Sequence, residues 1–112
     1  MSCLFCSIVA KEIPASIRHE DVECVAFDDI HPKAPTHILV IPKAHIPSVR
    51  ELTENDAALM GRLVLVAAKL AESAGIGERG YKLVMNCGKE GGQVVPHLHL
   101  HLLGGKPLSG IV

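Results

Sequence analysis

Three histidines alternate with leucines near the C-terminal end of the chain, in the run Pro96-His97-Leu98-His99-Leu100-His101-Leu102-Leu103. Successive side chains of a β-strand point to opposite faces of a sheet, so the run predicts a strand with imidazoles on one face and leucines on the other. The imidazoles would lie at a spacing of roughly 6.7 Å, and the leucines would enter the core. The chain therefore needs a sheet with one face in the core and the histidines on the other.

Helix-like and strand-like patterns occupy the first half of the chain. Apolar residues at helical spacing predict a short helix over residues 4–12, which ends before Pro14. Strands are predicted over residues 23–28 and 37–42, and the second is apolar almost throughout, as in a strand buried on both faces. A proline-bearing loop over residues 31–35 separates the two strands.

A long helix and then a hairpin are predicted for the second half. Thr53 and Asp56 form a capping-box pattern, and apolar residues then recur at intervals of three and four, which predicts a helix over residues 53–74. Strands over residues 81–87 and 95–103 flank a glycine-rich turn, so we expect them to form an antiparallel hairpin.

The order of these elements predicts the fold class. A helix, strands, a long helix and further strands are typical of an α+β fold, with the helices on one face of an antiparallel sheet. The 112 residues have the length of one domain, and we expect a single domain over residues 1–112.

Composition argues against nucleic-acid and membrane partners. Eleven Lys and Arg residues nearly balance twelve Asp and Glu residues, and no block of like charges occurs along the chain. Two Phe, one Tyr and no Trp leave few rings for stacking on single-stranded nucleic acid. The N-terminus lacks the pattern of a signal peptide, and no apolar run is long enough to span a membrane. We therefore expect a cytoplasmic protein.

Two kinds of chemistry use imidazoles at this spacing. The three histidines could bind a catalytic metal ion, or one of them could attack an electrophile while its neighbours orient it and move protons. Glycines flank the histidine run on both sides, and backbone amides without a Cβ can approach an anion closely. This favours a phosphorus electrophile; the glycines concerned are Gly88, Gly91, Gly92, Gly104 and Gly105.

The histidine run resembles the signature of the histidine triad (HIT) superfamily, and further segments resemble its Hint branch of nucleoside phosphoramidate hydrolases. The resemblance extends over about residues 4–105. It implies a HIT-like antiparallel sheet of about five strands, with a short N-terminal helix and one long helix. The other matching segments are Lys11-Glu12-Ile13-Pro14, Phe27-Asp28-Asp29-Ile30, Ala34-Pro35-Thr36-His37, Val40-Ile41-Pro42-Lys43-x-His45 and Gly91-Gly92-Gln93.

The resemblance implies a covalent mechanism. By position, His99 is the nucleophile that attacks the α-phosphorus of a nucleotide and forms a nucleotidyl-histidine, which water then hydrolyses. His97 and His101 orient His99 or share in proton handling, and His45 lies in the phosphate pocket. His99 also has an imidazole on both sides, so neighbours could set its tautomer and charge. No metal ion is needed for this chemistry.

The resemblance also implies a nucleotide site. Asp29 corresponds to a ribose-binding carboxylate, and Asn86 and Gln93 would bond the phosphate or the leaving group. Four apolar residues correspond to the walls of a purine slot, although plain core packing explains them equally well. The full expected set is Phe5, Ile8, Phe27, Asp29, Ile30, Asn86, Gly92, Gln93, Val94, His99 and His101.

Cys3 and Cys6 form a second motif, Cys-x-x-Cys. Two thiolates and two imidazoles complete a tetrahedral zinc shell, and the resemblance implies a structural zinc held with His45 and His97. The alternative is a pair of reduced thiols against the core. A coordinated nitrogen cannot also move a proton, so this assignment conflicts with direct catalytic work by the same two histidines.

Two departures from the Hint pattern concern the leaving group. Val94 stands where Hint proteins commonly carry a serine, and the chain ends with residues 106–112 where they extend into a tail that contains Trp. The resemblance implies a homodimer with the long helix and a strand at the interface, although the helix periodicity fits a monomer equally well.

The function expected from these patterns is hydrolysis of the P–N bond of purine nucleoside phosphoramidates. Three alternatives stay open: a dinucleoside polyphosphate hydrolase, a purine-nucleotide-binding interaction module with incidental turnover, and a metalloenzyme that uses His97, His99 and His101 as ligands.

Overall fold

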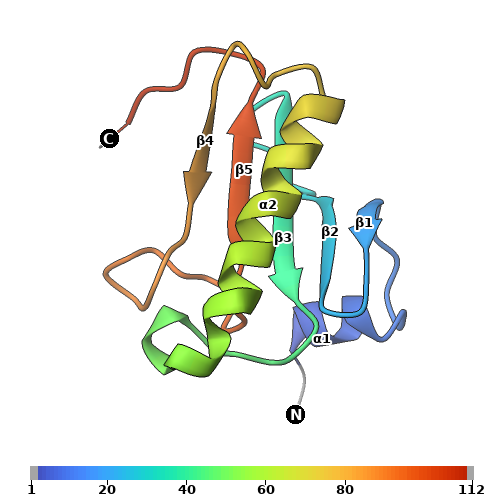
Figure 1. The fold of residues 1–112 in the computed structure, drawn as a ribbon, viewed down its shortest axis with the longest axis vertical. Coiled ribbons are helices and arrows are strands. Elements are labelled where there is room, and N and C mark those ends of the chain that lie inside the picture. Colours follow the sequence, from blue (N-terminus) through green and yellow to red (C-terminus); the bar gives the residue numbers. More distant parts are fainter. Residues whose placement is uncertain (1–2, 111–112) are drawn as a thin grey trace.

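A computed structural model describes residues 3–110, which form a five-stranded antiparallel sheet with two α-helices and two short 3₁₀ helices (Figure 1). The order of strands across the sheet is β1-β2-β3-β5-β4, and every neighbouring pair is antiparallel. The α+β class and the antiparallel pairing of the last two strands are confirmed. The strands are β1 (Ile17–Glu20), β2 (Cys24–Asp28), β3 (Thr36–Pro42), β4 (Tyr81–Val84) and β5 (Leu100–Gly104).

The long helix crosses one face of the sheet, over β3 and β5 (Figure 1). This helix is α2 (Ala57–Ser73), and it follows the 3₁₀ helices η1 (Val49–Glu51) and η2 (Glu54–Asp56). The predicted capping box is present, but it caps η2, so α2 begins four residues later than Thr53. The short N-terminal helix is α1 (Leu4–Val9), which ends before the predicted residue 12.

The two helices cover opposite faces of the sheet, so the prediction of helices on one face is wrong. Along β3, Ile38 and Val40 belong to a core cluster with residues of α2, whereas Leu39 and Ile41 belong to a second cluster with residues of α1. The physical reason is the nearly continuous apolar run of β3, which needs cover on both faces. The apolar sequence of this strand already indicated that burial.

The last strand is shorter than predicted, because β5 begins at Leu100. His97 and His99 precede it in a segment without regular secondary structure. There the Leu98 N–H donates to the Ile46 carbonyl at 2.7 Å, and not to a neighbouring strand. Leu98, Leu100 and Leu102 nevertheless all enter the α2-side core, as the alternation predicts.

Two other strand boundaries differ from the sequence patterns. Those patterns indicate no strand at β1, which is four residues long, mostly exposed, and paired with β2 through an irregular register. The sequence patterns also predict a strand that continues to residue 87. In the structure the pairing of β4 with β5 ends at Val84, which lies opposite His101. The remaining residues turn into the loop over residues 88–92, called the glycine loop below. Among the described residues, neither α-helix combines the length and apolarity needed to cross a bilayer.

Leu102 tests how far stability depends on the α2-side core. Its side chain is fully buried in that cluster, so we expect Leu102→Ala to lower the free energy of unfolding by about 2–5 kcal/mol. Leu4→Ala is the matched control, since Leu4 is 52% exposed, and we expect it to cost less than about 1 kcal/mol. Urea unfolding of the three proteins measures both values; equal losses would contradict this description of the core.

Candidate functional site

The predicted nucleophile lies on the α1 side of the sheet, nearly buried. His99 is 6% exposed and His97 is completely buried. The Phe5 ring of α1 meets both imidazoles edge-on, with centroid distances of 5.8 Å to His97 and 5.1 Å to His99. His101 lies within β5, and its ring centroid is 4.9 Å from that of His99. The alternation along the chain therefore brings His99 and His101 side by side.

A backbone carbonyl sets the tautomer of His99. Its Nδ1 lies 2.7 Å from the carbonyl oxygen of His97. A carbonyl only accepts hydrogen bonds, so Nδ1 carries the proton and donates it. In the neutral imidazole the lone pair is then on Nε2. The hydrogen bond to the carbonyl thereby orients the ring, and the lone pair on Nε2 takes no part in that bond.

His37 is a member of the site that the sequence did not single out. Its Nε2 lies 3.0 Å from Nδ1 of His101 and 3.4 Å from a carboxylate oxygen of Asp29. His37 reaches His101 diagonally, because His37 pairs with Leu103 and Leu39 pairs with His101 in the β3–β5 register. A backbone bond from the Asp29 N–H to the His37 carbonyl closes the loop between β2 and β3 and brings the carboxylate to this position.

The hydrogen bonds of the His37–His101 pair determine which ring nitrogen carries each proton. The Lys33 N–H donates to Nδ1 of His37 at 3.0 Å, so neutral His37 carries its proton on Nε2 and donates it to Nδ1 of His101. His101 then carries its own proton on Nε2. Burial, with smaller contributions from His99 and His37, lowers the pKa of His101 to about 4. Burial also lowers the pKa of His37, so both rings are neutral near pH 7.

Four side chains from distant parts of the chain form a cluster with the geometry of a metal site: Cys3, Cys6, His45 and His97 (the Cys/His cluster). The Cys3 and Cys6 Sγ atoms lie 3.4 and 3.6 Å from Nδ1 of His97, and Cys6 Sγ lies 3.3 Å from Nδ1 of His45. The two Nδ1 atoms are 3.2 Å apart. In a tetrahedral zinc site the Zn–N bonds are about 2.0 Å and the Zn–S bonds about 2.3 Å long. Two nitrogen ligands then lie about 3.3 Å apart, and a nitrogen and a sulfur ligand about 3.5 Å apart, close to the distances in the cluster.

The surroundings of His97 also suit a metal ligand. Its Nε2 lies 2.9 Å from the Pro42 carbonyl, so Nε2–H donates there and the Nδ1 lone pair faces the two thiols. Both ring nitrogens of His97 thus have partners away from the His99–His101 pair. His97 was expected to orient His99 or to handle protons; in the structure its contact with the His99 ring nitrogen is made by its backbone carbonyl. His45, which is exposed, joins the cluster through Nδ1.

The residues expected to form a purine slot separate into two groups. Phe5, Ile8 and Phe27 are 3–7% exposed and pack in the α1-side core. This is the core packing that the sequence patterns allowed as the alternative to a purine slot. Ile30 and Val94 are 82% and 89% exposed, and both lie on loops.

The expected phosphate-binding side chains lie at the glycine loop. Nδ2 of Asn86 donates to the Gly91 carbonyl at 2.7 Å, and Gln93 bonds the N–H of Gly88. Gly88 and Gly92 both have positive φ angles, of 72° and 81°. The loop therefore depends on glycine for its backbone conformation and on these two amides for its shape.

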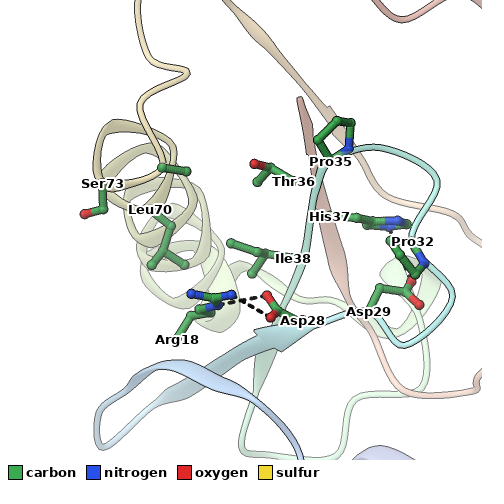
Figure 2. Close-up of a pocket in the computed structure, with 11 residues that line it drawn as sticks. Arg18, Asp28, Asp29, Pro32, Pro35, Thr36, His37, Ile38, Leu70 and Ser73 are labelled. Atoms are coloured by element: carbon green, nitrogen blue, oxygen red, sulfur yellow. Dashed lines mark hydrogen bonds and ion pairs between the residues drawn. The ribbon is translucent and has the colours of Figure 1, made fainter. Parts of the chain in front are cut away.

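A cavity of about 270 Å³ lies between α2 and the sheet and is lined in part by Asp29 and His37 (Figure 2). In Figure 2 Ile38 points toward Leu70 of α2, whereas His37 points away from the helix. Arg18 and Asp28 form a two-bond ion pair at the same cavity.

Comparisons with known proteins identify the family of the chain. The HIT domain family matches residues 10–108. The purine nucleoside phosphoramidase of Escherichia coli K12 is 50% identical over 106 residues, which cover 95% of this chain and 89% of that protein. The crystal structure of a HIT family hydrolase from Legionella pneumophila is 47% identical, with a TM-score of 0.95 and 96% of each chain covered.

A zinc-bound histidine triad family protein from Mycobacterium smegmatis is 34% identical, with a TM-score of 0.82 and coverage of 95% of this chain and 76% of that one. The family match extends over most of the described residues and includes the histidine run, His37 and Asp29. This chain belongs to the HIT domain family.

Proposed function

We propose that this protein hydrolyses the P–N bond of purine nucleoside phosphoramidates through a covalent nucleotidyl intermediate on His99. The observation that carries the proposal is the 2.7 Å contact between Nδ1 of His99 and the His97 carbonyl, which leaves Nε2 as the nucleophile. The E. coli purine nucleoside phosphoramidase, at 50% identity, supports the choice of substrate.

In the first step Nε2 of His99 attacks the α-phosphorus. The Nε2–P bond forms as the P–N bond to the leaving amine breaks, and the proton on Nδ1 stays bonded to the His97 carbonyl, which stabilises the positive charge that develops on the ring.

The leaving amine needs a proton as the P–N bond breaks, and we assign His101 to assist its departure. Neutral His101 carries its proton on Nε2, because Nδ1 accepts from His37. That Nε2–H donates a hydrogen bond to the departing nitrogen, which takes up a proton from solvent, so His101 stays neutral throughout.

Water completes the reaction. It attacks phosphorus and returns one proton to solvent, the P–Nε2 bond to His99 breaks, and the nucleoside monophosphate leaves with His99 restored. One water is consumed for each P–N bond, and the amine and the monophosphate are the two products.

The nucleotide contacts remain proposals. Asp29 would bind the ribose hydroxyls, and the amides of the glycine loop would bind the phosphate. Ile30 and Val94, whose side chains face solvent, would contact the base and the leaving group at the rim.

We also propose that the Cys/His cluster binds one structural zinc ion. The tetrahedral edge lengths and the His97–Pro42 bond support this, and so does the zinc-bound relative from M. smegmatis. When bound, zinc would cross-link α1, the loop after β3 and the histidine run, and the catalytic steps would need no metal.

We further propose that the protein is a homodimer. β4 is an edge strand with unpaired backbone groups on one side, and Leu83 on it is 36% exposed. Val64 and Leu65 on α2 are also exposed, at 45% and 61%. A symmetric interface would cover these apolar residues. The cytoplasmic location and the lack of a nucleic-acid partner stay predictions; the four free cysteines suit a reducing compartment.

His99→Asn tests the nucleophile. During turnover of adenosine phosphoramidate, a rapid acid quench and intact-protein mass spectrometry should show one adenylyl group on the wild type and none on His99→Asn. We expect kcat/KM to fall by at least about 10³-fold, since the nucleophile is lost. An adduct on His99→Asn, or full activity of that variant, would rule out the proposed role.

His37→Asn is the companion variant in the same experiment. It removes the donor to His101 but leaves the nucleophile, so the adenylyl adduct should still form, and more slowly than in the wild type. Unchanged unfolding curves for both variants would show that neither effect comes from loss of the fold.

Cys6→Ser tests the zinc site. We expect the wild type to hold one zinc per chain by elemental analysis, and the variant to bind zinc at least about 10-fold more weakly. A chelator should lower the thermal midpoint of the wild type, because metal binding is linked to folding. The control Cys87→Ser changes an exposed thiol outside the cluster and should keep its zinc. Metal-free wild type with an unchanged midpoint would contradict the proposal.

The dimer is tested by light scattering on a size-exclusion column. The wild type should have twice the mass of one 112-residue chain, and the double variant Leu65→Lys, Leu83→Lys should have the mass of one chain, because it places charges on the exposed apolar residues. A monomeric wild type would overturn the proposed assembly.

A further inference from the structure

The side chain of Gln93 has no free donor with which to bind a substrate phosphate. Its Oε1 accepts from the Gly88 N–H at 2.9 Å, and its Nε2 donates to the Pro47 carbonyl at 2.7 Å and to the Val95 carbonyl at 3.0 Å. A carboxamide has two N–H donors, and both are used here. The orientation of the amide follows from its partners, since Gly88 N–H only donates and the two carbonyls only accept.

These bonds join two separate loops. Gln93 also donates its backbone N–H to the Gly88 carbonyl at 3.0 Å, so both polar groups of Gly88 are bonded to one residue, and the base of the glycine loop is closed. The Pro47 carbonyl lies on the loop after β3, two residues beyond His45 of the Cys/His cluster. Gln93 is therefore a clamp between the glycine loop and the segment that carries His45.

The glycine loop is a tight turn whose backbone the clamp holds at its base. A Cβ at Gly91 would lie 2.3 Å from the Cys87 carbonyl oxygen, so the backbone passes close to itself there. A second tie, from the Leu98 N–H to the Ile46 carbonyl, holds the histidine run to the same segment as Pro47. The two ties together place the glycine loop relative to the residues that lead into His99.

We propose that Gln93 is a positioning residue that fixes the glycine-loop amides for the substrate phosphate, and that it makes no contact with the substrate. This inference rests on the proposed function, because it requires that the glycine loop binds the phosphate. It replaces the expectation from the family resemblance that Gln93 bonds the phosphate directly. Loss of the clamp should then weaken substrate binding and have little effect on bond breaking.

Gln93→Met tests the clamp, because methionine has a similar length and no amide. In substrate-free protein, the Gly88 amide proton should exchange at least about 10-fold faster with solvent, measured by nuclear magnetic resonance. With adenosine phosphoramidate, KM should rise about 10-fold while kcat changes less than about 3-fold. The matched control Asn55→Leu removes an exposed carboxamide in η2 and should leave all three readouts unchanged.

The outcomes separate positioning from direct contact. A fall in kcat with unchanged Gly88 exchange would show that Gln93 acts on the substrate itself and would overturn the inference. Unchanged exchange and unchanged kinetics would overturn it as well. If the wild type neither binds AMP nor turns over the phosphoramidate, the proposed function fails first and the positioning role fails with it; that case is recognised in the wild type alone, before any variant is measured.

Discussion

The pairing of β3 with β5 is the interaction on which the rest of the structure depends. It places the leucines of the histidine run beneath α2 and the imidazoles on the opposite face, beside α1. A shift of one residue in this register would exchange the two faces, burying imidazoles under α2 and removing leucines from the core. The same register brings His37 within 3.0 Å of His101. Core packing and site geometry therefore share one cause.

Backbone groups, more than charged side chains, determine the state of the imidazoles. The His97 carbonyl sets the His99 tautomer, the Pro42 carbonyl sets that of His97, and the Lys33 N–H sets that of His37. These groups belong to strands and closed loops and keep their direction during a reaction, so the rings need no reorganisation. Burial adds to this by keeping His37 and His101 neutral.

The Cys/His cluster lies where a six-residue helix must be held against the sheet. A helix as short as α1 is not stable by itself, and its apolar contacts are few: Phe5 and Ile8 are its buried residues. Cys3 and Cys6 sit at the start of this helix, and Phe5 between them contacts His97 and His99. A metal ion in the cluster would thus support the same face of the sheet that carries His99, the proposed nucleophile, and would connect the stability of α1 to the shape of the site.

The sequence by itself determined the elements whose pattern is local. The alternation of leucine and histidine, the periodicity of α2 and the apolar run of β3 predicted the main elements, because side-chain direction in strands and helices repeats over a few residues. The tertiary structure alone decided which distant groups meet. His37 became a partner of His101 through the β3–β5 register, and Gln93 found Pro47, forty-six residues away, through loop closure. It also decided that β5 begins at Leu100, since the segment before it bonds the loop after β3. Contacts of this kind depend on strand order and loop path, which no local pattern encodes.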